Sequence, residues 1–173
     1  MTQDVPFSSV QDERWSEIRE FPGYSVSDWG RVLNMRTGFY IKATRNTKDL
    51  YMIGLMRNGT QHKRSLPLLV AGEYVCRSND AFDVPINLDG DRGNNHYHNL
   101  MWRPLWFARK YSRQFVDGHA TVEDPIEDVE TGEIYKNSMH ASTMHGILDI
   151  EIYLSMINNT YVWPTGQIFR EAL

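Results

Sequence analysis

The sequence contains a single cysteine, Cys76, and no apolar run of membrane-spanning length. One cysteine cannot form a disulfide within the chain, and this composition is typical of a reducing compartment. The first residues, Met-Thr-Gln-Asp-Val-Pro-Phe-Ser-Ser, lack the basic and apolar regions of a secretory signal peptide. We therefore expect a cytosolic protein that has no membrane partner.

Basic residues are scarce in the last third of the chain. The 173 residues include 18 Lys and Arg against 22 Asp and Glu, which gives a net charge of −4. Residues 1–118 hold 16 of the basic and 13 of the acidic residues, whereas residues 119–173 hold 2 and 9. Because nucleic-acid-binding surfaces are usually basic, any DNA-facing surface is expected in the first two thirds.

Alternating apolar and polar residues predict strands near the N-terminus. Tyr24 and Val26 alternate with serines, as in a half-buried strand. The turn Asp28-Trp29-Gly30 then leads into a partner strand. Trp15 and Trp29 are expected to belong to the core of this β-rich module.

A hairpin and a short helix are predicted to complete the module. Asn58-Gly59 is a strong hairpin signal between predicted strands at residues 51–57 and 61–66. Residues 68–75 are expected to form a short buried helix, with Pro67 suited to its first turn.

The hairpin and the loop before it carry five basic residues. They are candidates for phosphate contacts, because cations on a strand edge can follow a duplex backbone. An ordinary solvated face or a charged sheet edge explains them equally well. The five candidates are Arg45, Lys48, Arg57, Lys63 and Arg64.

The middle of the chain carries a recognisable set of motifs. Leu88-Asp89-Gly90-Asp91, then Asn94-Asn95, then Asn99-Leu100-Met101-Trp102 resemble the core of the HNH nuclease family, in the branch of phage and intron homing endonucleases. The run from Trp15 to Asn34 resembles a nuclease-associated modular domain that often precedes an HNH unit. The resemblance implies a ββα unit that holds one metal ion.

The resemblance also assigns the family's chemical positions to this sequence. The first metal ligand and the general base correspond to Ile86 and Asn87, and the ligand on the helix corresponds to Ala108. Ile86 and Ala108 have no donor atoms, and an amide is too weakly basic to replace a histidine. We therefore expect no catalytic residues and no cofactor, with a divalent metal only if the protein is an active nuclease.

Other family positions are retained or have nearby substitutes. Asp89, Asn95 and Asn99 keep the residues of the family scaffold, and Asn99 is expected to brace the loop. His96 and His98 are the alternative candidates for a rearranged metal site, although loop histidines without a ligand are the more common case.

The last 50 residues predict a separate module with two short helices. A hairpin is expected in residues 125–135, followed by helices capped by Ser138 and Asp149. This order resembles a helix-turn-helix-like module found after HNH cores. The second helix, residues 149–158, carries two acids and no base, unlike a DNA-reading helix. Its many apolar residues indicate either deep packing, which we favour, or a protein contact.

The sequence thus predicts an α+β protein with three modules. They are a β-rich module at residues 12–77, an HNH-like ββα unit at 78–116 and a two-helix module at 124–173, joined by a linker at 116–124. We expect a catalytically inactive relative of HNH homing endonucleases that binds protein partners in an assembly, in the host cytoplasm or a phage virion. The alternatives are a DNA-binding protein and an active metal-dependent nicking endonuclease.

Overall fold

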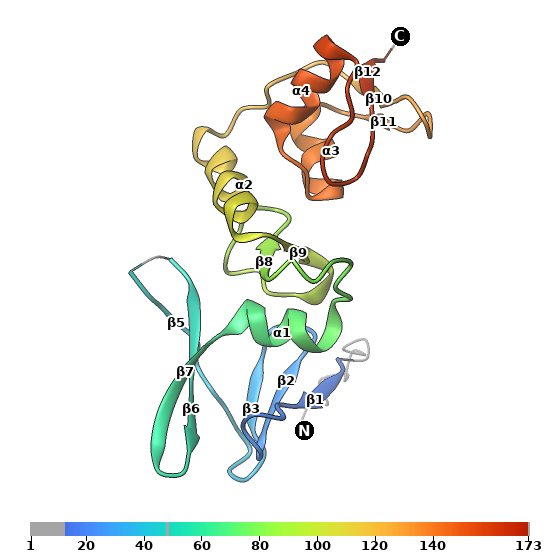
Figure 1. The fold of residues 1–173 in the computed structure, drawn as a ribbon. Helices are drawn as coiled ribbons and strands as arrows, with labels where there is room; N and C mark the ends of the chain where they lie inside the picture. Colours follow the sequence, from blue (N-terminus) through green and yellow to red (C-terminus); the bar gives the residue numbers. More distant parts are fainter. Residues whose placement is uncertain (1–12, 48, 173) are drawn as a thin grey trace, which may run out of the picture. The chain divides into compact units, whose positions relative to one another are not determined.

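The computed structural model describes residues 13–47 and 49–172 and has the expected α+β architecture (Figure 1). The chain divides into two compact units. The N-terminal unit extends to Cys76 and also includes the loop Arg92–His98. The C-terminal unit contains Arg77–Asp91 and the residues from Asn99 onward. Within the described residues, every helix is too short or too polar to cross a membrane.

Two antiparallel sheets and one helix form the N-terminal unit, with strand orders β1-β2-β3-β4 and β5-β6-β7. The elements are β1 (Trp15–Glu17), β2 (Tyr24–Ser27), β3 (Val32–Asn34), β4 (Phe39–Tyr40), β5 (Thr44–Arg45), β6 (Tyr51–Arg57), β7 (Thr60–Ser65) and α1 (Leu66–Tyr74).

The β6–β7 hairpin forms as predicted, because Asn58 and Gly59 both adopt the positive φ that its turn requires. The helix begins two residues earlier than expected, with Pro67 in its first turn. The prediction for β2 was wrong in one respect, since all four of its residues are buried. Ser27 fits there because its hydroxyl accepts a hydrogen bond from the Arg31 backbone N–H.

The two tryptophans expected in the core are partly exposed. Trp15 is 36% and Trp29 is 43% exposed. Trp15 packs at the surface beside Tyr40, and Trp29 contacts His96. Smaller apolar side chains occupy the core of this unit instead, including Val26 and Leu55.

In the C-terminal unit a two-stranded ladder leads into a helix, which confirms the ββα expectation. The order β11-β10-β12 makes a second sheet, and two helices lie against it. The elements are β8 (Val84–Asn87), β9 (Leu100–Arg103), α2 (Leu105–Asp117), β10 (Ile126–Asp128), β11 (Ile134–Tyr135), α3 (Ser138–His145), α4 (Asp149–Asn158) and β12 (Phe169–Glu171). A 3-10 helix, η1 (Tyr97–Asn99), precedes β9.

The expected central and C-terminal modules form one compact unit in the structure. Leu148, just before α4, is buried in a cluster with Ile86 of β8 and Phe107 of α2. Arg103 of β9 is also buried, and its guanidinium donates to the carbonyl oxygens of His145 and Gly146 at 2.9 Å. Shared apolar contacts and these hydrogen bonds join the residues on both sides of the expected boundary near residue 120 within this unit.

Three local expectations near this boundary need correction. Asn137, and not Ser138, caps α3, because its side chain accepts from the His140 N–H. Asp149 does not cap α4, since its buried carboxylate accepts hydrogen bonds from Thr121 and Ser138. The expected linker at 116–124 overlaps the end of α2, and Thr121 is fixed by that carboxylate.

The apolar helix α4 packs with only one of its faces. Ile152 is fully buried and Met156 packs against the same cluster. The other apolar residues of α4, at spacings of three and four, are between 39% and 59% exposed. They are Ile150, Tyr153, Leu154 and Ile157. The expectation of packing therefore describes half of this helix.

Candidate functional site

Hydrocarbon side chains fill the two positions that the resemblance to the HNH family assigns to metal ligands. Ile86 is 5% exposed and packs with Phe107 and Tyr111. Ala108, one turn into α2, packs against the same cluster. Metal ions in nucleases need oxygen or nitrogen donors, so these two positions do not fit the ion that the family implies.

Asn87, which the resemblance assigns to the position of the general base, lies at the end of β8. It lies opposite Leu100 in the β8–β9 ladder, and its carbonyl oxygen accepts from the Gly90 N–H at 3.0 Å. Its side chain is half-buried. An amide cannot take a proton from water near neutral pH, so this residue supports the loop and does not supply a base.

The loop that follows β8 is braced as expected from the sequence. The Asn99 side-chain amide donates to Asp89 Oδ1 at 2.8 Å, and the Asp89 N–H donates to Asn99 Oδ1 at 3.1 Å. Asp89 Oδ1 also accepts from the Asp91 N–H at 2.9 Å, across the turn that contains Gly90. Asp89 and Asn99 therefore brace this loop, as the sequence predicted.

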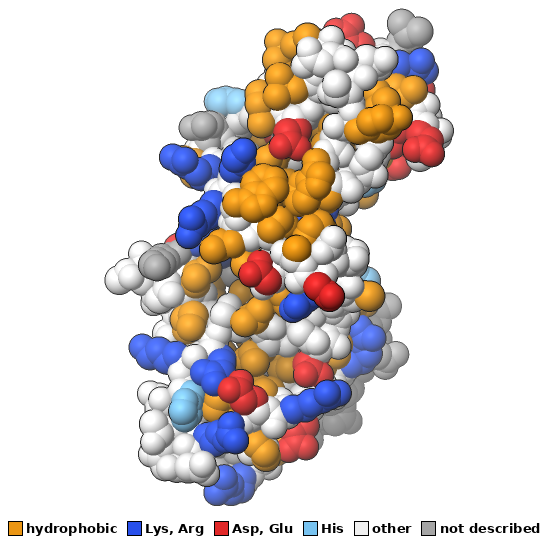
Figure 2. All heavy atoms as spheres, in the orientation of Figure 1, with side chains coloured by type: hydrophobic (Ala, Val, Ile, Leu, Met, Phe, Trp, Pro, Cys, Tyr) orange, Lys and Arg blue, Asp and Glu red, His pale blue; other side chains and the backbone are white. Residues whose placement is uncertain are grey.

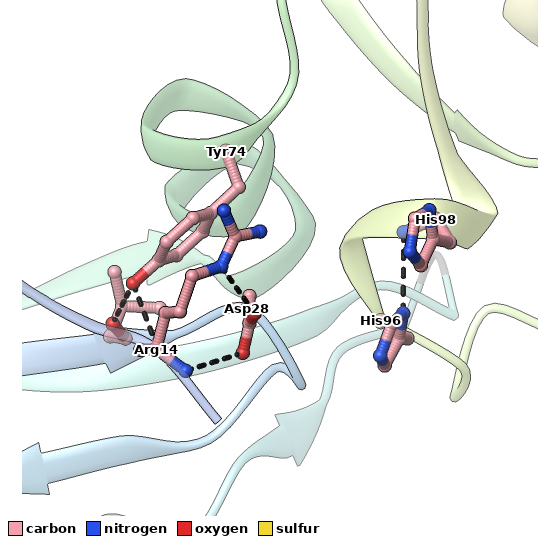
Figure 3. Close-up of polar contacts among 6 residues, drawn as sticks. Arg14, Asp28, Tyr74, His96 and His98 are labelled. Carbon is pink, nitrogen blue, oxygen red and sulfur yellow. Dashed lines mark hydrogen bonds and ion pairs between the residues drawn. The ribbon is translucent and has the colours of Figure 1, made fainter. Parts of the chain in front are cut away.

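His96 and His98 belong to the N-terminal unit, where their rings lie nearly parallel with centroids 5.4 Å apart (Figure 3). His96 Nδ1 accepts from the His98 backbone N–H at 3.3 Å. Partial burial, and then the charge of His98, lower the pKa of His96. Among the residues that the structure describes, no three His, Cys, Asp or Glu side chains are grouped to hold a metal ion.

A polar network that the sequence did not reveal holds this loop within the N-terminal unit, and Figure 3 shows its Arg14–Asp28 contacts. Asp28 is 3% exposed and accepts from the backbone N–H and Nε of Arg14 at 3.1 and 2.9 Å. The Tyr97 N–H donates to the Asp28 carbonyl oxygen at 2.8 Å, and the Arg14 guanidinium lies over the Tyr97 ring.

Asn95, the third scaffold residue, is 4% exposed in the same loop. Its amide donates to the carbonyl oxygens of Arg92 and Gly93. A side chain at Gly30, which has φ +81°, would approach Asn95 Cβ to 2.9 Å. This close approach requires glycine in the turn after Asp28. The absence of a side chain at Gly30 lets the loop pack against this turn.

The basic residues predicted to contact phosphate are partly engaged within the protein. Arg45 pairs with Asp49 at 2.6 Å, and Arg64 pairs with Glu20 at 2.5 Å. Arg57 and Lys63 are exposed on the β6–β7 hairpin. Lys48 lies outside the described residues. The structure therefore leaves two of the five candidates on an open strand surface.

A second basic surface, which the sequence reasoning missed, lies on α2. Arg109, Lys110 and Arg113 are exposed on one side of the helix, and we call these three residues the basic face. None of them forms an ion pair with an acidic side chain that the structure describes. Figure 2 shows Lys and Arg side chains beside a hydrophobic surface at the level of α2. Helical spacing of cations in residues 105–117 was the available signal.

Comparisons with known proteins agree with this architecture. Residues 13–55 match the NUMOD4 motif. Two uncharacterized HNH endonucleases of Acanthamoeba polyphaga mimivirus are 29% and 24% identical to the chain over 89 and 93 residues. These matches cover 51% and 54% of this chain, which spans about a quarter of the length of each relative, 26% and 23%.

The fold also resembles a solved structure of DNA binding and cleavage by the HNH homing endonuclease I-HmuI. The two match with a TM-score of 0.52 and 22% identity, over 92% of this chain and 98% of the other. Together, the fold and the sequence matches define an HNH-endonuclease-like protein. The chain resembles the HNH homing endonucleases and carries a NUMOD4 motif in its N-terminal unit.

Proposed function

We propose that this protein binds DNA through an HNH-like scaffold and does not cleave it by the family's metal-assisted mechanism. The observation that supports binding most directly is the basic face of α2, three exposed cations that form no ion pair with a described acid. Exposed cations on one helix face can neutralise successive phosphates of a DNA backbone. Lys110 also interacts electrostatically with Glu151, so Arg109 and Arg113 are the cations of the basic face with the least charge compensation within the protein. The similarity to I-HmuI, whose structure is one of DNA binding and cleavage, supports the same ligand class.

The replaced positions support the absence of cleavage. Metal-assisted hydrolysis of a phosphodiester needs donors that hold the ion and a base that activates water. Ile86 and Ala108 belong to an apolar cluster, and Asn87 is an amide. Loss of one donor could be compensated by a neighbour, but here the two ligand positions and the base position are changed together.

The proposed binding mode can be tested by the salt dependence of DNA affinity. We expect replacement of Arg109, Lys110 and Arg113 by glutamine to weaken binding to a labelled duplex. Because each lost phosphate contact reduces the slope of log K against log salt by about 0.9, the slope should flatten by up to about 3. Fluorescence anisotropy at several salt concentrations measures this slope.

A control variant that loses the same number of positive charges distinguishes the effect of local phosphate contacts on the salt slope from the effect of net charge. Arg45, Arg64 and Arg170 each form an ion pair with a neighbouring acid. Their replacement by glutamine should change the slope much less than the basic-face variant does. An equal effect of the two triple variants, or no effect of either, would contradict binding through α2.

A second function, assembly with protein partners as in a phage particle, is supported by the exposed apolar side of α4. Ile150, Leu154 and Ile157 are all more than 40% exposed on this helix. If this surface joins copies of the chain, sedimentation velocity should detect an oligomer. Replacement of Ile150 and Leu154 by serine should then dissociate it, whereas a purely monomeric wild-type protein would remove support for self-assembly.

A further inference from the structure

Two tryptophans form an exposed pair in the C-terminal unit, next to the basic face. Trp106, in the first turn of α2, is 50% exposed, and Trp163, in the segment before β12, is 40% exposed. Their ring centroids are 5.1 Å apart, with an angle of 37° between the planes. Exposed indoles this close together are large apolar surfaces that a soluble protein normally buries.

Buried aromatic residues pack against this pair on the side of the core. Trp163 contacts Phe82 with centroids 5.6 Å apart and Phe107 with centroids 5.4 Å apart. Phe107 is fully buried and Phe82 is 8% exposed. The exposed surface of the pair therefore rests on the core of the unit, which reduces the entropy lost when a ligand stacks on it.

The cations of the basic face lie on the same helix as Trp106. Lys110 Nζ is 5.5 Å from the centroid of the Trp106 ring. Arg109 and Arg113 follow Trp106 at the spacings of three and seven that place residues on one side of a helix. An aromatic surface with adjacent cations matches a nucleotide, which carries an aromatic base beside an anionic phosphate.

We propose that Trp106 and Trp163 form a stacking platform for an unpaired nucleobase, in single-stranded or locally melted DNA. The basic face holds the phosphates next to that base. This assignment rests on the proposed DNA binding and narrows its ligand, because bases inside a perfect duplex are stacked on each other and offer no free face. Stacking on indole is tolerant of sequence, since every base has an aromatic face.

The charges beside the platform favour nucleic acid over a protein ligand. A protein contact of similar size would bury the apolar rings and leave Arg109 and Arg113 to find acidic partners. A nucleic acid strand provides an anion with every base, so it satisfies the rings and the cations together.

The test compares three DNA probes of equal length with the full chain. They are a labelled single strand of mixed sequence, the perfect duplex and the same duplex with an internal unpaired loop. The variants are Trp106→Leu, the aromatic rescue Trp106→Phe and the control Tyr161→Leu. Tyr161 is an aromatic residue that is 75% exposed in the same unit. Anisotropy gives the affinities, and sedimentation velocity without DNA reports self-association.

We expect the wild-type protein to prefer the single strand and the looped duplex over the perfect duplex. Trp106→Leu should weaken binding to the two probes with unpaired bases by roughly 5- to 150-fold and leave the perfect duplex little changed. Trp106→Phe should retain most of the preference, and Tyr161→Leu all of it.

Three results would overturn the platform. The first is equal affinity of the wild-type protein for all three probes, and the second is an equal loss on all probes in Trp106→Leu. The third is an oligomer that Trp106→Leu dissociates, because the aromatic surface would then be a protein contact. If the basic-face variant changes the salt slope while Trp106→Leu changes no preference, DNA binding stands and the platform alone is wrong.

Discussion

At the scale of single residues, Ile86 tests the assignment of a metal-ligand position to an apolar core. The side chain is 5% exposed and packs with Phe107 and Tyr111. We expect Ile86→Asp to lower the free energy of unfolding by about 3 kcal/mol, because a carboxylate would lose hydration without gaining a partner. Urea denaturation measures this change.

The neighbouring position provides a matched comparison for that substitution. Asn87 is half-buried at the end of β8, so Asn87→His should cost much less than Ile86→Asp. If Ile86→Asp unfolds at the same urea concentration as the wild type, the position is not part of an apolar core. That result would reopen it as a ligand site.

Gly90 makes a second prediction at the residue scale. Its φ is +77°, and a Cβ there would lie 2.4 Å from the Phe115 ring. Gly118 has a similar φ of +69° but nothing within 4 Å of a Cβ. Gly118→Ala should cost about 1 kcal/mol of unfolding free energy from backbone strain alone.

Gly90→Ala should cost more, because the Phe115 ring must move as well. Thermal or urea unfolding measures the loss of stability in each variant. Gly118→Ala reports backbone strain alone, and Gly90→Ala reports backbone strain together with the contact with Phe115. Equal destabilisation would show that Phe115 moves aside at no cost, and would contradict the tight packing of the loop on α2.

At the scale of elements, the sequence predicted what turn residues and periodicity determine. Asn58-Gly59 located the β6–β7 hairpin, and the Asp89-to-Trp102 motifs located the β8–β9–α2 unit. The helix caps were less predictable, because Asn137 and Ser138 are adjacent and both are good cap residues. Which oxygen reaches the helix N–H depends on the approach of the chain.

The roles of individual cations could not be predicted from the sequence. Arg64 and Arg113 are both basic residues on predicted elements, yet only Arg64 finds a described acid, Glu20, 44 residues away in the chain. Such pairing depends on tertiary contacts. The number of Lys and Arg residues in a segment, which favoured the hairpin, therefore does not show which of them are free to contact phosphate. The helical spacing of the basic face is visible in the sequence, but its lack of ion pairs with the described acids is visible only in the structure.

Arg103 links two elements that the sequence assigned to different modules. It is 5% exposed and donates to carbonyl oxygens at the end of α3, those of His145 and Gly146. Arg103→Met would keep much of the side-chain volume and leave these carbonyls without their donor, at about 1–3 kcal/mol for each buried group. We expect faster amide hydrogen exchange in α3.

Arg170 is the matched control for this prediction. Its ion pair with Glu127 is exposed on the arginine side, so Arg170→Met should destabilise the protein much less than Arg103→Met does. If the two variants exchange alike in α3, the guanidinium of Arg103 does not hold that helix in place.

At the scale of the whole molecule, the two compact units differ from the three modules that the sequence predicted. The loop Arg92–His98 belongs to the N-terminal unit, although it lies between β8 and β9 in the chain. The Asp28 carbonyl oxygen accepts a hydrogen bond from the loop, and Gly30 leaves space for the loop to pack. No local sequence pattern predicts such long-range contacts. The chain thus combines an HNH-like fold with apolar side chains at the two positions that the resemblance assigns to metal ligands.

Incubation of the protein with supercoiled plasmid and Mg²⁺, Mn²⁺ or Zn²⁺ tests the central claim most directly. The assay should use protein concentrations that saturate DNA binding, so that failure to cut is not failure to bind. We predict that the plasmid remains supercoiled with every metal, because Ile86, Asn87 and Ala108 provide neither ligands nor a base. Metal-dependent nicking that His96→Ala or His98→Ala abolishes would contradict the account and establish a rearranged active site.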